Sequence, residues 1–259
     1  MLILHLRDVK QYILSIIYMD KIRKFVSKNK TLSFLIKPAY RRISGLYYNI
    51  KTKNKPFDSK KYWEDRYVSK SNSGAGSYGR LALFKAEVIN DFVEKNNINS
   101  AIEFGCGDGN QLSLLKIPKY IGLDVSKKSI ELCKGIFAAD QSKSFFLYDP
   151  QYFINKTHVF ETDLTMSLDV IFHLVENEIF EKYMHDLFSC SKKYVIIYSS
   201  NTDDQGKFMA QHVLLRKFSN WIEKNASNWK LITKINNKYP LNNNPEEESL
   251  SDFYIYTKK

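Results

Sequence analysis

Short apolar runs alternate with longer segments of mixed polarity over most of this chain. The apolar runs lie at residues 101–104, 120–123, 145–148, 164–168 and 194–198. Apolar side chains recur at helical spacing between residues 80 and 95, at Leu81, Phe84, Val88, Ile89 and Phe92. Buried strands that alternate with helices are typical of doubly wound sheets. The pattern therefore predicts an α/β fold, Rossmann-like and doubly wound, with a mostly parallel sheet and helices on both faces.

Two further apolar runs near the end of the chain lack a helical segment between them. They lie at residues 230–235 and 253–256, and the polar stretch 242–248 stands in the connection. Antiparallel strands need no helical crossover, whereas parallel neighbours do. We therefore expect an antiparallel strand at the C-terminal edge of the sheet, formed by the pairing of these two runs.

The first quarter of the chain follows a different pattern. Residues 9–27 read as a helix with a partial cationic face beside an offset apolar stripe. A linker-like stretch follows at residues 51–55 and is closed by proline. We expect residues 1–61 to form a basic, partly amphipathic helical extension with a linker, and residues 62–259 to form the main domain.

The positive charge of the chain belongs to that extension. Lys and Arg number 39 against 28 Asp and Glu, a formal net charge of +11. Residues 1–61 hold 15 basic and 3 acidic residues, a net charge of +12, and residues 62–259 hold 24 and 25, a net charge of −1. The extension is therefore expected to meet an anionic membrane surface or a partner protein, with RNA as the less favoured alternative.

The cysteines and the apolar stretches indicate in which cellular compartment the protein is expected. Cys106, Cys133 and Cys190 are widely spaced, which favours neither a disulfide framework nor a zinc site, and no other ligand spacing predicts a metal. The apolar stretch at residues 12–19 is far shorter than the ~20 residues of a membrane-spanning helix. The largely apolar residues 1–6 are followed at once by charged residues and by no small-residue cleavage site, so a cleaved secretory signal is not expected. We expect a cytoplasmic protein, and the basic extension suits peripheral attachment to the inner membrane face.

A glycine-rich turn directly follows the apolar run at residues 101–104. Gly105, Gly107 and Gly109 stand in a G-x-G-x-G pattern, which differs from the G-x-G-x-x-G turn that seats a pyrophosphate. A second apolar run ends at Asp124, about 20 residues downstream, where a carboxylate can accept hydrogen bonds from ribose hydroxyls. The two features together indicate an adenosine-type cofactor that lacks a pyrophosphate.

With these motifs, residues 62–259 resemble the class I S-adenosylmethionine-dependent methyltransferases. Glu103 and the three glycines look like the first motif of that family, and Asp124 looks like its ribose-binding acid. Residues 163–174 are similar to its fourth strand and the following segment. The resemblance implies S-adenosyl-L-methionine as the cofactor, covered by a helix at 62–67 and a loop at 74–79. The residues implied to bind it are Glu103, Gly105, Gly107, Gly109, Asp124, Ser167, Tyr62 and Arg66.

A narrower resemblance concerns the methyl acceptor. Residues 73–81 and 167–174 are similar to stretches of methyltransferases associated with surface-polysaccharide biosynthesis. This implies O-methylation of a sugar hydroxyl in a glycan or glycolipid intermediate. The asparagine-proline-proline-aromatic motif of amino-directed nucleic-acid methyltransferases is missing at residues 167–169, which disfavours base N-methylation. The alternatives are an RNA methyltransferase, or an inactive cofactor-binding partner domain of a glycan-assembly complex.

A sugar hydroxyl is a weak nucleophile, so its methylation benefits from a positioned base. The candidates are Asp169, His173 and His212, which follow strands of the predicted sheet. Each also has an interpretation in which it is not the base. Asp169 would hold a backbone turn or the methionine part of the cofactor, His173 would cap or pack against the next helix, and His212 would be a surface residue. His212 and Arg216 stand four residues apart, and we expect them on one helix face, which favours His212 for substrate contact.

Overall fold

The computed structural model describes residues 57–205, 210–242 and 244–259. The chain divides into two units, residues 1–56 and 57–259, and only the second is described. The helix expected at residues 9–27 lies outside the described residues. The division falls five residues before the one that the sequence indicated, because a helix already begins at Ser59.

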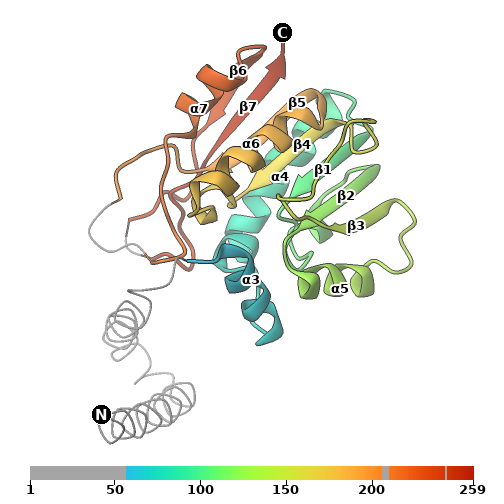
Figure 1. Ribbon diagram of the computed structural model, residues 1–259, viewed down its shortest axis with the longest axis vertical. Helices are drawn as coiled ribbons and strands as arrows, with labels where there is room; N and C mark the ends of the chain where they lie inside the picture. The colour runs from blue at the N-terminus through green and yellow to red at the C-terminus, as the bar shows by residue number, and fades with distance from the viewer. Residues whose placement is uncertain (1–56, 206–209, 243) are drawn as a thin grey trace, which may run out of the picture. The chain divides into compact units, whose positions relative to one another are not determined.

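A seven-stranded mixed sheet forms the centre of this unit (Figure 1). Its strands are β1 (Ser100–Phe104), β2 (Lys119–Asp124), β3 (Lys143–Leu147), β4 (Thr162–Leu168), β5 (Ser191–Ser199), β6 (Trp229–Ile235) and β7 (Asp252–Lys258). The spatial order is β3-β2-β1-β4-β5-β7-β6, in which β1 to β5 pair in parallel. β7 pairs antiparallel with both β5 and β6. The expected mostly parallel sheet with an antiparallel C-terminal strand is therefore confirmed.

Helices cover both faces of the sheet, as the alternation in the sequence predicts. They are α4 (Gly79–Lys95), α5 (Lys127–Ile136), α6 (Asn177–Ser189) and α7 (Phe218–Asn225), while α3 (Ser59–Val68) lies over the strand ends. Buried residues of α4 and α5 belong to one apolar cluster, and those of α6 and α7 belong to a second cluster. In Figure 1, α6 lies in front of the sheet and α4 lies behind it. The sheet is thus doubly wound.

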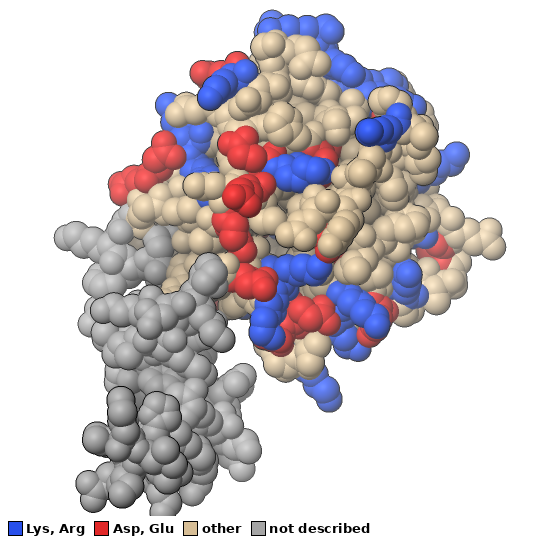
Figure 2. Space-filling view, viewed as in Figure 1, with Lys and Arg blue, Asp and Glu red and all other residues tan. Residues whose placement is uncertain are grey.

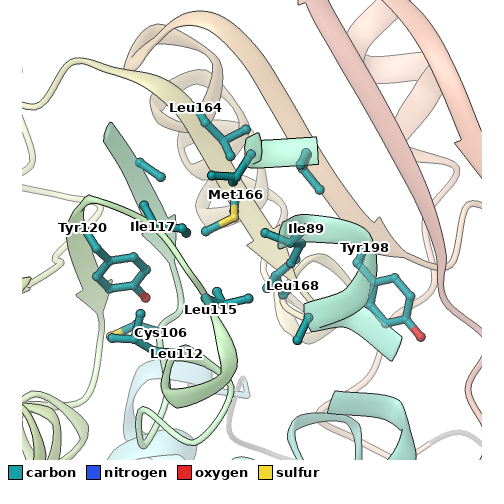
Figure 3. Packing of buried hydrophobic residues seen from close by; sticks show 14 of the residues in the cluster. Ile89, Cys106, Leu112, Leu115, Ile117, Tyr120, Leu164, Met166, Leu168 and Tyr198 are labelled. Carbon is teal, nitrogen blue, oxygen red and sulfur yellow. The ribbon is translucent and has the colours of Figure 1, made fainter. Parts of the chain in front are cut away.

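The cluster beneath α4 fixes the strands that carry the glycine-rich turn. Figure 3 shows Met166 of β4 among Ile89 of α4, Ile117 and Leu115, all of which are buried. Full burial of one such apolar side chain contributes about 1.5–3 kcal/mol. Since β1 pairs with both β2 and β4, this packing holds the carboxyl ends of the three strands side by side.

The segment that contains His212 is a loop, so the expectation of a helix with Arg216 on the same face was wrong. The helix begins only at Phe218. The reason is that main-chain N–H groups before Phe218 are hydrogen-bonded to residues outside this segment. Leu214 N–H donates to the carbonyl of Phe172, and Lys217 N–H donates to the Asp203 carboxylate, at 2.8 Å each.

The surface of the described unit carries no net charge excess. Residues 57–259 hold 26 basic and 26 acidic residues, and Figure 2 shows both signs spread over the visible face. Within the described residues, no helix is long and apolar enough to cross a membrane. The charge excess of the chain therefore lies in its first 56 residues.

Candidate active site

The candidate site lies where the sheet reverses its winding direction. β1 is flanked by β2 on one side and β4 on the other, so the connections leave toward opposite faces at this point. Open α/β sheets bind ligands in the crevice at the carboxyl ends of such strands. Glu103 stands near the end of β1, Asp124 ends β2, and Asp169 follows β4.

Two glycines of the turn after β1 occupy positions that no other residue fits. Gly105 and Gly107 have φ angles of +85° and +58°, in the left-handed region that favours glycine. A Cβ on Gly105 would collide with the side chain of Val170, and one on Gly107 would collide with Ser73. The side chains of Val170 and Ser73 therefore pack directly against the backbone of this turn, which requires glycine at both positions.

Asp124 ties the end of β2 to this turn. One carboxylate oxygen accepts the Gly107 N–H at 2.9 Å, and the other accepts the Ser126 N–H at 2.9 Å. Burial raises the pKa of Asp124 to about 6, against the opposing effect of these two hydrogen bonds. The group is ionised at neutral pH. Each oxygen keeps a second lone pair, so the carboxylate is able to accept hydrogen bonds from ribose hydroxyls.

Glu103 is a buried acid next to the turn. The Tyr120 hydroxyl donates to its carboxylate at 2.6 Å. Burial raises the pKa of Glu103 to about 7, while this hydrogen bond and the charge of Lys85 act in the opposite direction. Its charge therefore changes near neutral pH.

The stability of the protein should reflect that raised pKa. The folded state binds a proton at Glu103 more tightly than the unfolded state. The free energy of unfolding that this proton contributes is therefore lost as pH rises from about 4.5 through 7. A Glu103→Gln variant lacks this titration. The difference in unfolding free energy between variant and parent should therefore rise by about 2–3 kcal/mol, in favour of the variant, from pH 5 to pH 8. Urea denaturation at both pH values measures this. A difference that stays constant with pH would contradict it, and Glu94→Gln on the exposed face of α4 serves as the control.

Asp169 is held by a buried ion pair. Its carboxylate accepts from Lys85 Nζ at 2.8 Å and from the Ser251 hydroxyl at 2.7 Å. The Lys85 side chain is 1% exposed, and Asp169 has a φ of +59°, which is strained for a residue other than glycine. A Cβ on Gly76 would collide with this carboxylate, so the loop before α4 also packs on it. Asp169 thus fastens three segments together through its two carboxylate oxygens.

Ser167, on β4, is fully buried. The Tyr183 hydroxyl donates to its Oγ at 2.7 Å and also lies 3.0 Å from the carbonyl of Phe104. The Ser167 hydroxyl is therefore part of the buried packing beneath the strand ends, and its expected contact with the cofactor stays a prediction.

His173 and His212 are 39 residues apart in the sequence, and the fold brings them into contact. Their ring centroids are 5.3 Å apart, and the rings are stacked at 20°. Tyr62 of α3 stacks on the outer side of His212 at 4.6 Å, and Trp63 meets His173 edge-on at 4.9 Å. Burial and the charge of Arg66 lower the pKa of His173 to about 3 and that of His212 to about 4. Both imidazoles are therefore neutral at physiological pH.

Helix α3 places Tyr62 and Arg66 beside these histidines. The Arg66 Nε donates to the carbonyl of Asn72 at 2.7 Å, and its guanidinium lies 5.4 Å from the Trp63 ring centroid. The charge of this guanidinium lowers the pKa of both imidazoles. The structure places both residues beside the histidines, and their expected contact with the cofactor stays a prediction.

Further residues fasten α3 and its following loop over the strand ends, and the sequence analysis did not assign them. Glu64 accepts from the Ser126 hydroxyl at 2.6 Å, at the start of α5. Ser59 N–H donates to Glu176, before α6, at 2.8 Å. Asp108 accepts from the Ser73 N–H and the Tyr78 hydroxyl, which clamps the loop onto the glycine turn. Only Asp108 had a signal in the sequence, since it stands inside the turn.

Among the described residues, no group of three or more His, Cys, Asp and Glu side chains is placed to hold a metal ion. The three cysteines are buried and unpaired.

Solved structures share this fold. The methyltransferase domain of bacterial CtHen1-C is 20% identical over 67% of this chain and 96% of its own length, with a TM-score of 0.53. Magnesium protoporphyrin IX methyltransferase from Synechocystis PCC 6803, with S-adenosylmethionine bound, is 14% identical over 80% of this chain and 100% of its own, with a TM-score of 0.54. The small RNA methyltransferase HEN1 is 16% identical over 71% of this chain and 26% of its own, with a TM-score of 0.55.

The described unit therefore has the fold of class I S-adenosylmethionine-dependent methyltransferases. Neither a protein-family model nor a curated protein sequence matches the chain. The methyl acceptor has to be inferred from the site itself, because the similar structures have names that point to different acceptors.

Proposed function

We propose that this protein transfers a methyl group from S-adenosylmethionine to a hydroxyl of a glycan or glycolipid intermediate. One observation supports S-adenosylmethionine as the cofactor. The glycine-rich turn is hydrogen-bonded to Asp124 at the place where the sheet of this methyltransferase fold reverses its winding direction. The resemblance of residues 73–81 and 167–174 to methyltransferases of surface-polysaccharide biosynthesis supports the acceptor class. The neutral histidine pair supports a hydroxyl as the acceptor group.

The residues of the site fit this cofactor. S-adenosylmethionine, when bound, supplies a methyl group on a positively charged sulfur. Asp124 would hold the ribose hydroxyls, and the turn at Gly105 and Gly107 allows the backbone to approach without a Cβ in the way. Much of the acceleration of methyl transfer comes from alignment, which the contacts of α3 with both sides of the crevice support.

Replacement of Asp124 by Ala is expected to weaken S-adenosylmethionine binding about 100-fold. Loss of two hydrogen bonds to a charged acceptor costs roughly 3 kcal/mol, which corresponds to that factor. Isothermal titration with S-adenosylmethionine measures the change, and circular dichroism confirms folding. Asp91→Ala, an exposed acid on α4, is the matched control and should bind as the parent does. A parent protein that binds no S-adenosylmethionine would refute the proposed function itself.

The acceptor is tested with tritiated S-adenosylmethionine and two fractions of host extract, a lipid-linked glycan fraction and total RNA. Label in the glycan fraction, with a mass gain of one CH₂ on a sugar, supports the proposal. Label that disappears after ribonuclease treatment would replace it with the second candidate, RNA methylation. The charge of +12 on residues 1–61 favours that candidate, since phosphate contacts require basic residues and make binding sensitive to salt.

A further inference from the structure

The hydrogen bond of His173 fixes which ring nitrogen carries the proton. Its Nδ1 lies 2.8 Å from the main-chain carbonyl oxygen of His212. A carbonyl oxygen only accepts, so Nδ1 is the protonated nitrogen and Nε2 holds a lone pair. Within the described residues, Nε2 makes no hydrogen bond. The lone pair is therefore available to a ligand.

Ring contacts hold the imidazole of His173 in place. The ring of His173 is flanked by the ring of His212 at 5.3 Å and by Trp63 at 4.9 Å, and Phe172 packs at 4.5 Å. The residue belongs to a short 3₁₀ helix, Ile171–His173, that begins two residues after Asp169. A base on a rigid element at the carboxyl edge of the sheet meets the requirement for positioned proton transfer.

The two other candidates are less suited to act as the base. Asp169 is bonded to Lys85 and Ser251, so proton uptake there would break a buried ion pair. The ring of His212 is stacked between Tyr62 and His173, and no hydrogen bond within the described residues sets its tautomer. Its carbonyl, by contrast, has a defined role, because it sets the tautomer of His173.

The charge beside His173 and His212 indicates which kind of methyl acceptor the site suits. Arg66 is the charged side chain that acts on both imidazoles. A guanidinium at this position repels an ammonium group, so it disfavours amine acceptors and is compatible with a neutral hydroxyl or an acceptor that carries a negative group.

We propose that Nε2 of His173 takes the proton of the acceptor hydroxyl, with the His212 carbonyl as its positioning group. This inference rests on the proposed function. As the acceptor oxygen bonds to the methyl carbon, the carbon–sulfur bond breaks and its electron pair stays on sulfur. The O–H electron pair remains on oxygen, and the proton passes to Nε2 and then to solvent. An oxygen that gains a third bond becomes strongly acidic, so a weakly basic imidazole is able to accept its proton.

The tautomer is tested first, and without an acceptor. Full-length protein with ¹⁵N-labelled histidine rings is examined by long-range ¹H–¹⁵N NMR, and the His173 signals are assigned by their loss in His173→Phe. The expected result is a proton on Nδ1 and none on Nε2. A proton on Nε2 would overturn the proposal, whether or not the protein transfers methyl groups.

The catalytic role is tested with His173→Gln, whose side-chain amide is still able to donate to the His212 carbonyl but holds no basic nitrogen. Tritium transfer to the lipid-linked glycan fraction should fall at least about 100-fold, with S-adenosylmethionine affinity within about threefold of the parent. His185→Gln, at an exposed position on α6, is the matched control and should transfer as the parent does. Transfer by His173→Gln within threefold of the parent would refute the base, while the cofactor titration reports on the proposed function separately.

Discussion

Replacing Lys85 with methionine is expected to lower the free energy of unfolding by about 3–5 kcal/mol, because removal of one partner leaves a buried charge without compensation. Lys85 is 1% exposed, and the Asp169 side chain that it holds is 16% exposed. Asp169 would then stay in its strained backbone conformation with only the Ser251 hydroxyl as a partner. Equilibrium unfolding in urea at pH 7.5 measures the loss.

The double variant with Lys85→Met and Asp169→Asn separates charge from packing. It should lose less stability than Lys85→Met alone, since no charge remains unpaired. Lys95→Met is the matched control: its pair with Asp91 is exposed on the same helix, and such pairs contribute about 0–1 kcal/mol. If Lys85→Met unfolds within 1 kcal/mol of the parent, the ion pair does not fasten the loop, the helix and the C-terminal segment as described.

Gly105→Ala should abolish useful cofactor binding, with at least about a 100-fold loss of affinity for S-adenosylmethionine. The new Cβ would face Val170 at a position where φ is +85°, so the turn has to move to relieve the collision. Strain of this kind costs about 1–3 kcal/mol, and a shifted turn no longer meets Asp124 through the Gly107 N–H. Isothermal titration gives the affinity, and thermal denaturation gives the stability.

Gly135→Ala provides the matched control. Gly135 lies in α5, and a Cβ there would meet no atom within 4 Å. Alanine in a helix interior is favoured over glycine by about 0.5–1 kcal/mol, so this variant should be slightly more stable and bind as the parent does. Equal cofactor affinity in the two variants would mean that the turn at Gly105 does not contact the cofactor.

The sheet and its helices were predictable because their information is local. Each parallel strand is a short apolar run, and the helix at residues 79–95 shows its buried face as a periodic pattern. The glycine-rich turn and its bond to Asp124 were predictable for the same reason, since Gly105, Gly107 and Asp124 stand at fixed offsets from two strands. A glycine-rich turn after one apolar run and an acid at the end of the next therefore mark the carboxyl ends of two strands from the sequence alone.

The acceptor side was harder to predict, because it depends on contacts between distant segments. The stack of Tyr62, His212 and His173 joins three separate segments, and no spacing in the sequence relates them. The loop at His212 also escaped prediction, since its helical spacing was overridden by hydrogen bonds to Phe172 and Asp203.

One unused signal was present in the sequence. Lys85 stands midway between Leu81 and Ile89, four residues from each, on the apolar face of its helix. A lysine on such a face is either exposed at its edge or buried with a partner. The identity of the partner, Asp169, became clear only from the fold, because 84 residues separate the two groups.

Helix α3 joins the two halves of the doubly wound sheet, and this has a kinetic consequence. Glu64 bonds to the start of α5 on the β1–β3 side, and Ser59 bonds to Glu176 before α6 on the β4–β5 side. A molecule bound at the strand ends beneath α3 leaves only when contacts to one half are broken. If the proposed function holds, we therefore expect the opening of this helix to limit ligand exchange and product release to be the slow step.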